Sequence, residues 1–252
     1  MASSTLTIAP NEVVEAISKY AIRPKEPEFL RVHLGDGRTA SIHPYPLRVS
    51  REIRTGDRNY TQSEGLVYGL TSDEEFGVLD LLSTDELPLR HVKLAENKAA
   101  AYSDEGRPYK ENVLAPYWTR TGQFIWLRND NALRKALALP VGSSDDSTGL
   151  LVTRDRKSPS GYASRQITVP TKTGYFVAIP DDIPSDVDIL SARPNVKEIV
   201  YWNGNYPDEN GLSAVGCGWS SGVEGLDAVA YWPLVRLDFG VLGIGTDAPL
   251  NK

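Results

Sequence analysis

The sequence has few of the residues that carry most metal and redox chemistry, with one cysteine and three histidines among 252 residues. Because Cys217 stands alone, no disulfide can form within the chain, and a four-cysteine zinc site within one chain is excluded. We therefore expect either a reducing compartment or a fold that does not depend on cross-links. Neither a metal ion nor a cofactor is expected.

Long apolar runs are also missing. None approaches the roughly 20 residues that a membrane-spanning helix needs. Residues 1–10 lack the basic start and the apolar stretch of a signal peptide. These features predict no membrane contact and no secretion by that route, so we expect the protein in the cytoplasm or in a virion.

A strong excess of one charge is absent as well, since 27 basic and 33 acidic residues give a net charge of −6. Such a mild acidic balance favours solubility and provides no basic surface for DNA or RNA. Contact with nucleic acid is therefore not expected. Hydrophobic residues make up 40% of the chain, which is enough for a packed core.

The first half of the chain has mixed patterns. Apolar residues at helical spacing predict helices over residues 11–20 and from residue 72 onward, where Ser72 to Glu75 suggests a capping box. Alternation around Gly35-Asp36-Gly37 predicts a hairpin with Leu30, Val32 and Leu34 buried, and Arg31, His33 and Ser41 exposed. We expect a strand over 87–94, then over 95–112 a long surface loop, or a fraying helix around Ala99–Ala101. A strand is expected over 123–128 and a helix over 131–139.

The second half is typical of an all-β region. Strands are expected over Leu150–Thr153, Tyr162–Val169, Tyr175–Ile179, Val196–Trp202 and Ala228–Phe239. The predicted fold class is therefore β-rich, α+β in the N-terminal half and all-β in the C-terminal half, forming an antiparallel sandwich or barrel with two or three short helices. The division is residues 1–141 and 150–252 with a linker at 142–149, or one single domain over 1–252.

One local motif resembles a catalytic signature. Residues 218–222 read Gly-Trp-Ser-Ser-Gly, which matches the serine elbow of α/β-hydrolases. In those enzymes the histidine follows the serine, whereas His33, His43 and His91 all precede Ser220 here, and no helical pattern follows the motif. A chymotrypsin-like order is arithmetically allowed, but the flanking residues differ from those of that family. We predict that Ser220 is not a nucleophile.

Three classes of function remain. A non-enzymatic structural or assembly protein is favoured, such as a component of a viral particle (capsid, capsid-stabilising or tail protein). The alternatives are a glycan- or ligand-binding β-domain and a hydrolase with an unrecognised carboxylate-based site. Aromatic residues suited to a sugar platform are Tyr117, Trp118, Trp126, Tyr201, Trp202, Trp219, Tyr231 and Trp232.

The chain ends carry the assembly hypothesis. Ordering a tail costs roughly 1–2 kcal/mol per residue in backbone entropy, so a polar tail needs contacts to become ordered. Leu6 and Ile8 are the apolar residues of the N-terminal segment, and Leu250 is one of two near the C-terminus. Thr5 to Ile8 alternates in the manner of a strand that adds to a sheet edge. We therefore expect protein partners, in a homo-oligomer or larger assembly, with Leu6, Ile8 and Leu250 as assembly residues.

Overall fold

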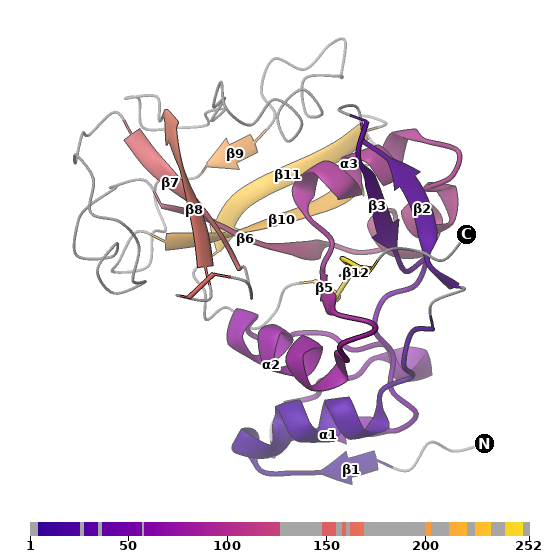
Figure 1. The fold of residues 1–252 in the computed structure, drawn as a ribbon. Coiled ribbons are helices and arrows are strands. Elements are labelled where there is room, and N and C mark those ends of the chain that lie inside the picture. Colours follow the sequence, from indigo (N-terminus) through magenta and orange to yellow (C-terminus); the bar gives the residue numbers. More distant parts are fainter. Residues whose placement is uncertain are drawn as a thin grey trace.

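The computed structural model describes residues 5–25, 28–34, 37–56, 58–126, 148–154, 158–159, 162–168, 200–202, 212–220, 225–232 and 240–248. Within these ranges the chain forms four α-helices and three sheets, most of whose strand pairs are antiparallel (Figure 1). The fold is thus a mixture of helices and mainly antiparallel open sheets. The finer expectation of a sandwich or barrel stays a prediction.

The N-terminal layer consists of two packed helices and a small parallel sheet. Its elements are β1 (Thr5–Thr7), the 3₁₀ turn η1 (Pro10–Glu12), α1 (Val13–Tyr20), β4 (Glu52–Arg54), the turn η3 (Ser63–Gly65) and α2 (Ser72–Leu82). The predicted helices are confirmed, although the capping box of α2 joins Thr71 and Glu74, one residue earlier than expected. Gly77 lets α1 approach α2 closely, because a Cβ atom there would lie 2.9 Å from Val14.

A four-stranded antiparallel sheet has the strand order β2-β3-β12-β5. Its strands are β2 (Leu30–His33), β3 (Thr39–Ile42), β12 (Ile244–Thr246) and β5 (Leu89–His91). The predicted hairpin is confirmed, with Val32 and Leu34 buried, and Arg31 and His33 exposed. Leu30, also expected to be buried, is only half-buried. The expected exposure of Ser41 is wrong, since it is 9% exposed. β3 is an interior strand, and Thr246 of β12 lies beside Ser41 on the side away from β2.

The segment over 95–112, expected as a surface loop or a fraying helix around Ala99–Ala101, is helical at those residues, and the helix is mostly buried up to residue 101. It contains α3 (Leu94–Tyr102), α4 (Arg107–Tyr109) and the π-helical turn η4 (Lys110–Leu114). Gly106 packs on α3 so closely that a Cβ atom would lie 2.2 Å from Cα of Ala100. The amphipathic pattern is missing because α3 buries polar as well as apolar residues, so periodicity alone could not predict it.

The third sheet has six strands in the order β8-β7-β6-β10-β11-β9, all antiparallel except the last pair. Its strands are β6 (Thr119–Trp126), β7 (Thr148–Arg154), β8 (Tyr162–Thr168), β9 (Val200–Trp202), β10 (Leu212–Ser220) and β11 (Gly225–Trp232). β6, β7, β8, β9 and β11 each overlap a predicted strand, although their ends differ from the predicted bounds. β10 was not predicted. The expected helix over 131–139 and the strand over Tyr175–Ile179 lie outside the described residues.

Both larger sheets combine strands from the two halves of the sequence. β6 pairs with β7 and β10, and β12 joins the hairpin of β2 and β3. The division of the chain into domains stays a prediction. Two buried apolar clusters lie in this framework, one between α1, α2 and the N-terminal strands, the other between α3, the hairpin and β10. None of the helices in the described ranges is long and apolar enough to cross a membrane.

Candidate functional site

A buried charged cluster lies where α2, β5 and β6 meet. Oε2 of Glu75 lies 3.1 Å from Nε2 of His91 and 3.9 Å from Nη1 of Arg120. Nη1 of Arg120 also donates to Oγ of Ser72 at 3.0 Å. Ser72 and Glu75 are one turn apart at the start of α2, so both face the sheet strands. An imidazole and a guanidinium thus both lie within 3.9 Å of one carboxylate oxygen.

Packing around His91 fixes the orientation of its ring. Gly122 has φ of 66°, and a Cβ atom there would lie 2.8 Å from Cγ and Nδ1 of His91. Phe76 meets the same ring edge to face, with the ring centroids 5.0 Å apart. Since the carboxylate of Glu75 accepts, the Nε2 atom of His91 is the donor. The cluster contains the groups of an acid–base site, but its side chains are only 2–6% exposed. We therefore interpret it as a structural contact that joins α2 to β5 and β6.

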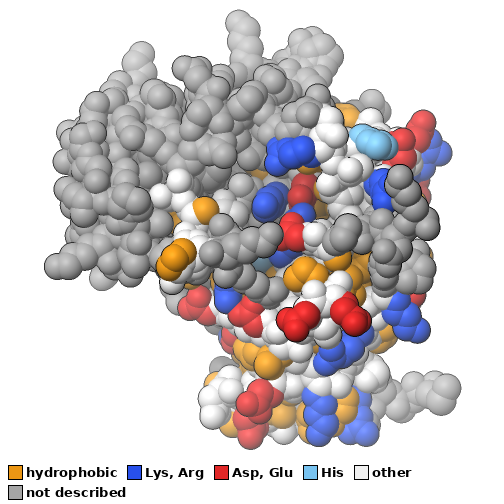
Figure 2. Space-filling model, in the orientation of Figure 1, with side chains coloured by type: hydrophobic (Ala, Val, Ile, Leu, Met, Phe, Trp, Pro, Cys, Tyr) orange, Lys and Arg blue, Asp and Glu red, His pale blue; other side chains and the backbone are white. Residues whose placement is uncertain are grey.

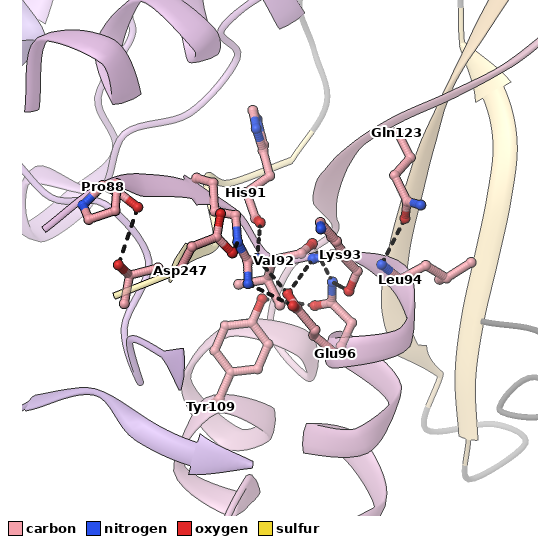
Figure 3. Close-up of polar contacts among 12 residues, drawn as sticks. Pro88, His91, Val92, Lys93, Leu94, Glu96, Tyr109, Gln123 and Asp247 are labelled. Atoms are coloured by element: carbon pink, nitrogen blue, oxygen red, sulfur yellow. Dashed lines mark hydrogen bonds and ion pairs between the residues drawn. The ribbon is translucent and has the colours of Figure 1, made fainter. Parts of the chain in front are cut away.

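A second polar network surrounds the beginning of α3 (Figure 3). Both Nη atoms of Arg90 donate to the carboxylate of Glu96 at 2.7 Å, and Nε donates to Asp247 at 2.6 Å. Although burial disfavours the charged guanidinium, the two carboxylates raise the pKa of Arg90 above its ordinary value. The network joins β5 to α3, which follows it closely in the sequence, and both to the C-terminal segment after β12, more than 150 residues later.

The same helix is anchored by amide and phenol groups. Oε1 of Gln123 accepts from the backbone N–H of Leu94, the first residue of α3. Asn97 is fully buried, donates to the carbonyls of Val92 and Lys93, and accepts from the hydroxyl of Tyr109 at 2.8 Å. Burial, followed by the nearby Cys217, raises the pKa of Tyr109 well above its ordinary value. These hydrogen bonds satisfy backbone groups at the start of α3, which burial keeps away from water.

These two networks were not found from the sequence. Glu75 was noted only as part of an expected capping box, and Glu96 and Arg120 stand in ordinary local patterns. The partners of Glu75 become evident only where α2 meets β5 and β6, and the partner of Glu96 only where β5 is followed by α3. One local signal existed, the spacing of Lys93 and Glu96, where the backbone N–H of Lys93 donates to Glu96.

The expected assembly residues are partly described. Leu6 and Ile8 are half-buried and pack against the core of α1 and α2 within their own chain. Their strand β1 pairs in parallel with β4, Leu6 opposite Ile53, and the N–H of Ile8 donates to the carbonyl of Arg54 at 2.9 Å. Leu250 lies outside the described residues. Whether these residues serve an assembly stays a prediction.

The other edge of β1 is open among the described strands. β1 and β4 form a sheet of two strands, and β1 lies at the outer margin of the molecule (Figure 1). Thr5 and Thr7 are exposed, and Oγ1 of Thr5 donates to Glu52 while Nε of Arg54 donates to Oγ1 of Thr7. The end of the molecule that contains β1 and α1 carries acidic, basic and hydrophobic side chains close together (Figure 2).

Trp219, one of the aromatic residues suited to a sugar platform, belongs to a surface aromatic cluster, and Trp118, another of them, lies next to it. Trp219 of β10 meets Tyr102 of α3 edge to face with centroids 5.6 Å apart, and Nζ of Lys110 lies 3.5 Å above its ring. The backbone N–H of Leu226 donates to the hydroxyl of Tyr102. Trp118 packs on Gly218, one residue before Trp219. Tyr102 is 46% exposed, so this cluster reaches solvent.

The histidines considered from the sequence are not brought together. His33 pairs with Thr39 near the turn, whereas His43 follows Ile42 at the other end of the hairpin. His43 is buried, and its Nδ1 lies 2.9 Å from the carbonyl of Tyr45. Within the described residues, no three His, Cys, Asp or Glu side chains are grouped to hold a metal ion. The side chain of Ser220, at the end of β10, lies outside the description.

Comparison with protein-family models, curated proteins and solved structures gave no match to this chain.

Proposed function

We propose that this protein is a non-enzymatic structural protein that works in a multi-chain assembly, with the open edge of β1 as the contact. A component of a viral particle, whether capsid, capsid-stabilising or tail protein, is the kind of assembly that we favour. The main support for this proposal is the arrangement of β1. Its apolar side chains pack inward on its own chain, and its outer backbone edge has no partner among the described strands.

The backbone geometry of β1 supports strand addition. Successive residues of a strand direct their N–H and C=O groups toward opposite edges. Because the N–H of Ile8 is directed at Arg54, the N–H and C=O groups of Thr7 are directed at the open edge, and those of Thr5 likewise. An edge of this kind binds another strand through backbone hydrogen bonds.

The packing of Leu6 and Ile8 gives the contact a rigid base. Both side chains rest on the cluster that contains Val13, Ile17 and Ile53, so β1 is held in extended form before a partner arrives. A preorganised strand loses less conformational entropy on association than a free tail. This differs from an unstructured tail that becomes ordered only in the assembly.

A proline substitution tests the contact. Thr7→Pro removes the N–H that faces the open edge, and keeps the N–H groups directed at β4. Thr7→Ala is the matched control, since it also loses the bond from Arg54 but keeps the N–H. Sedimentation velocity over a wide concentration range should show an oligomer for the full chain and for Thr7→Ala, and a smaller species for Thr7→Pro. Equal assembly of both variants would show that the open edge of β1 is not the contact.

A second function is favoured by the aromatic cluster of Tyr102, Lys110 and Trp219. A glycan- or ligand-binding surface would use the exposed Tyr102 ring together with the Trp219 ring and the ammonium group of Lys110. A glycan array with Tyr102→Ala as the comparison tests it, because Tyr102 is the most exposed of the three. Binding that persists unchanged in Tyr102→Ala, or no binding at all, would count against this function.

A further inference from the structure

We propose that the partner at the open edge is a second copy of this chain, with the two β1 strands antiparallel about a twofold axis at Leu6. This inference rests on the proposed function and names its partner. It extends the two-stranded sheet to four strands in the order β4-β1-β1-β4. The contact is isologous, as in most homo-oligomers.

The register follows from the outward-facing groups. With the axis at Leu6, Thr5 of one copy lies opposite Thr7 of the second copy, and the reverse pair is related by symmetry. Both residues direct N–H and C=O toward the edge, so each pair exchanges two hydrogen bonds. All the outward groups of Thr5 and Thr7 are then satisfied. Leu6 lies opposite its own symmetry mate at the closer spacing of a non-hydrogen-bonded pair, about 4.5 Å between Cα atoms.

The next residues limit the alternatives. The N–H of Ala9 already donates to the carboxylate of Glu12 at 2.9 Å, and Pro10, which has no N–H, begins η1. An axis at Thr7 would place Thr5 opposite Ala9 and would lose a donor there. The strand available for pairing therefore ends at Ile8, and the axis at Leu6 uses its outward residues fully.

Charges favour the antiparallel direction. Glu52 is bonded to Thr5, and Arg54 to Thr7, on the exposed face. In the antiparallel pair, the row across the sheet runs from Glu52 through Thr5 and then through Thr7 of the second copy to its Arg54, so unlike charges end each row. A parallel pair would place Glu52 and Glu52 of the second copy at the ends of one row. Unlike charges steer association and disfavour the wrong register.

Engineered cysteines test this geometry directly. Cys217 is fully buried, and burial raises the pKa of its thiol, so it contributes little reactive thiolate. Thr5→Cys and Thr7→Cys are prepared separately, mixed and oxidised mildly, with the unsubstituted chain as the blank. Opposed residues in a hydrogen-bonded pair have Cα atoms about 5.5 Å apart, within the range for a disulfide. Residue 5 and its own mate are about 8 Å apart, which is too far.

The expected result is a disulfide-linked dimer from the mixture, formed from one molecule of each variant, and little from either variant alone. Dimers from Thr5→Cys alone and from Thr7→Cys alone, in equal yield to the mixture, would indicate parallel pairing and overturn the inference. If the full chain is an oligomer by sedimentation but no cross-link forms, the second-copy pairing is wrong while a multi-chain assembly stands. A chain that is monomeric and also binds no other protein's strand at β1 would overturn both.

Discussion

Glu75 and His91 form a helix-to-strand hydrogen bond of 3.1 Å in which the two side chains are 2% and 4% exposed. Arg120 from β6 lies 3.9 Å from the same carboxylate oxygen. Removing a carboxylate and a guanidinium from water is costly, and close contact between them offsets much of that cost. The cluster therefore holds three elements in one arrangement, and each member depends on the others.

Replacing Glu75 by Gln should lower the free energy of unfolding by about 3 kcal/mol, because Arg120 is left buried without this carboxylate. Urea unfolding at neutral pH measures the difference. Glu15→Gln is the control, since Glu15 is an exposed residue of α1 and should change stability by less than about 0.5 kcal/mol. Equal losses in the two variants would mean that the buried cluster adds no stability.

Gly122→Ala should destabilise the fold more than a positive φ alone explains. Its Cβ atom would enter the His91 ring at 2.8 Å, and φ is 66°. Gly37→Ala is the matched control, because Gly37 has φ of 84° and nothing within 4 Å of the added atom. We expect roughly 1–2 kcal/mol for Gly37→Ala from the backbone conformation, and at least about 2 kcal/mol more for Gly122→Ala from the clash. Thermal unfolding of the two variants side by side measures the difference. Similar losses of stability would show that the His91 ring can move away from the added Cβ atom.

Local patterns predicted the local elements well. The two helices with an apolar stripe, α1 and α2, and the hairpin of β2 and β3 each satisfy a periodicity that a short window contains. The turn around Gly37 gives the register, in which the N–H of Leu34 donates to the carbonyl of Arg38. For these segments, the residues that form the element also determine its pairing.

The remaining features depend on contacts between distant segments. Ser41 is buried because β12, about 200 residues later, pairs with β3, and nothing near Ser41 indicates this. α3 has polar residues on buried sides, so the usual contrast between faces is missing. The contacts of Glu75 with His91 and Arg120 likewise follow from tertiary packing, which is why no site was predicted there. The Arg90–Glu96 pair is only six residues apart, but it depends on the change from β5 to α3, which the sequence patterns did not indicate.

Thr71→Ala should shorten or loosen the beginning of α2. Oγ1 of Thr71 accepts from the N–H of Glu74 at 3.1 Å, while the N–H of Thr71 donates to the Glu74 carboxylate at 2.7 Å. Loss of the side-chain cap costs about 1 kcal/mol. Thr71→Ser retains the hydroxyl and should stay within about 0.5 kcal/mol of the unsubstituted chain. Chemical denaturation measures both, and an alanine variant as stable as the serine variant would contradict the assigned cap.

Alkaline pH should destabilise the protein through Cys217. Burial raises the pKa of the Cys217 thiol above its ordinary value of 9.0, and burial together with Cys217 raises the pKa of Tyr109. The folded state thus keeps protons that the unfolded chain begins to lose from about pH 8 upward, first at the thiol and then at the phenol. Where the unfolded state binds fewer protons, stability falls as pH rises, by up to about 1.4 kcal/mol per pH unit for each group. Below about pH 8 these two groups should contribute almost no pH dependence.

Comparison of the unsubstituted chain with Cys217→Ala isolates the thiol. The alanine variant should be less stable at pH 7.5, because its smaller side chain leaves a void in the buried cluster that also contains Tyr109 and Leu226. Between pH 9 and pH 10.5, however, its unfolding free energy should fall less steeply, since one of the two groups that retain protons is gone. Urea unfolding at pH 7.5, 9.0, 9.8 and 10.5 gives both slopes, and exposed tyrosines and lysines cancel in the comparison. Parallel curves would show that the Cys217 thiol ionises as readily in the folded protein as in the unfolded chain, contrary to its burial.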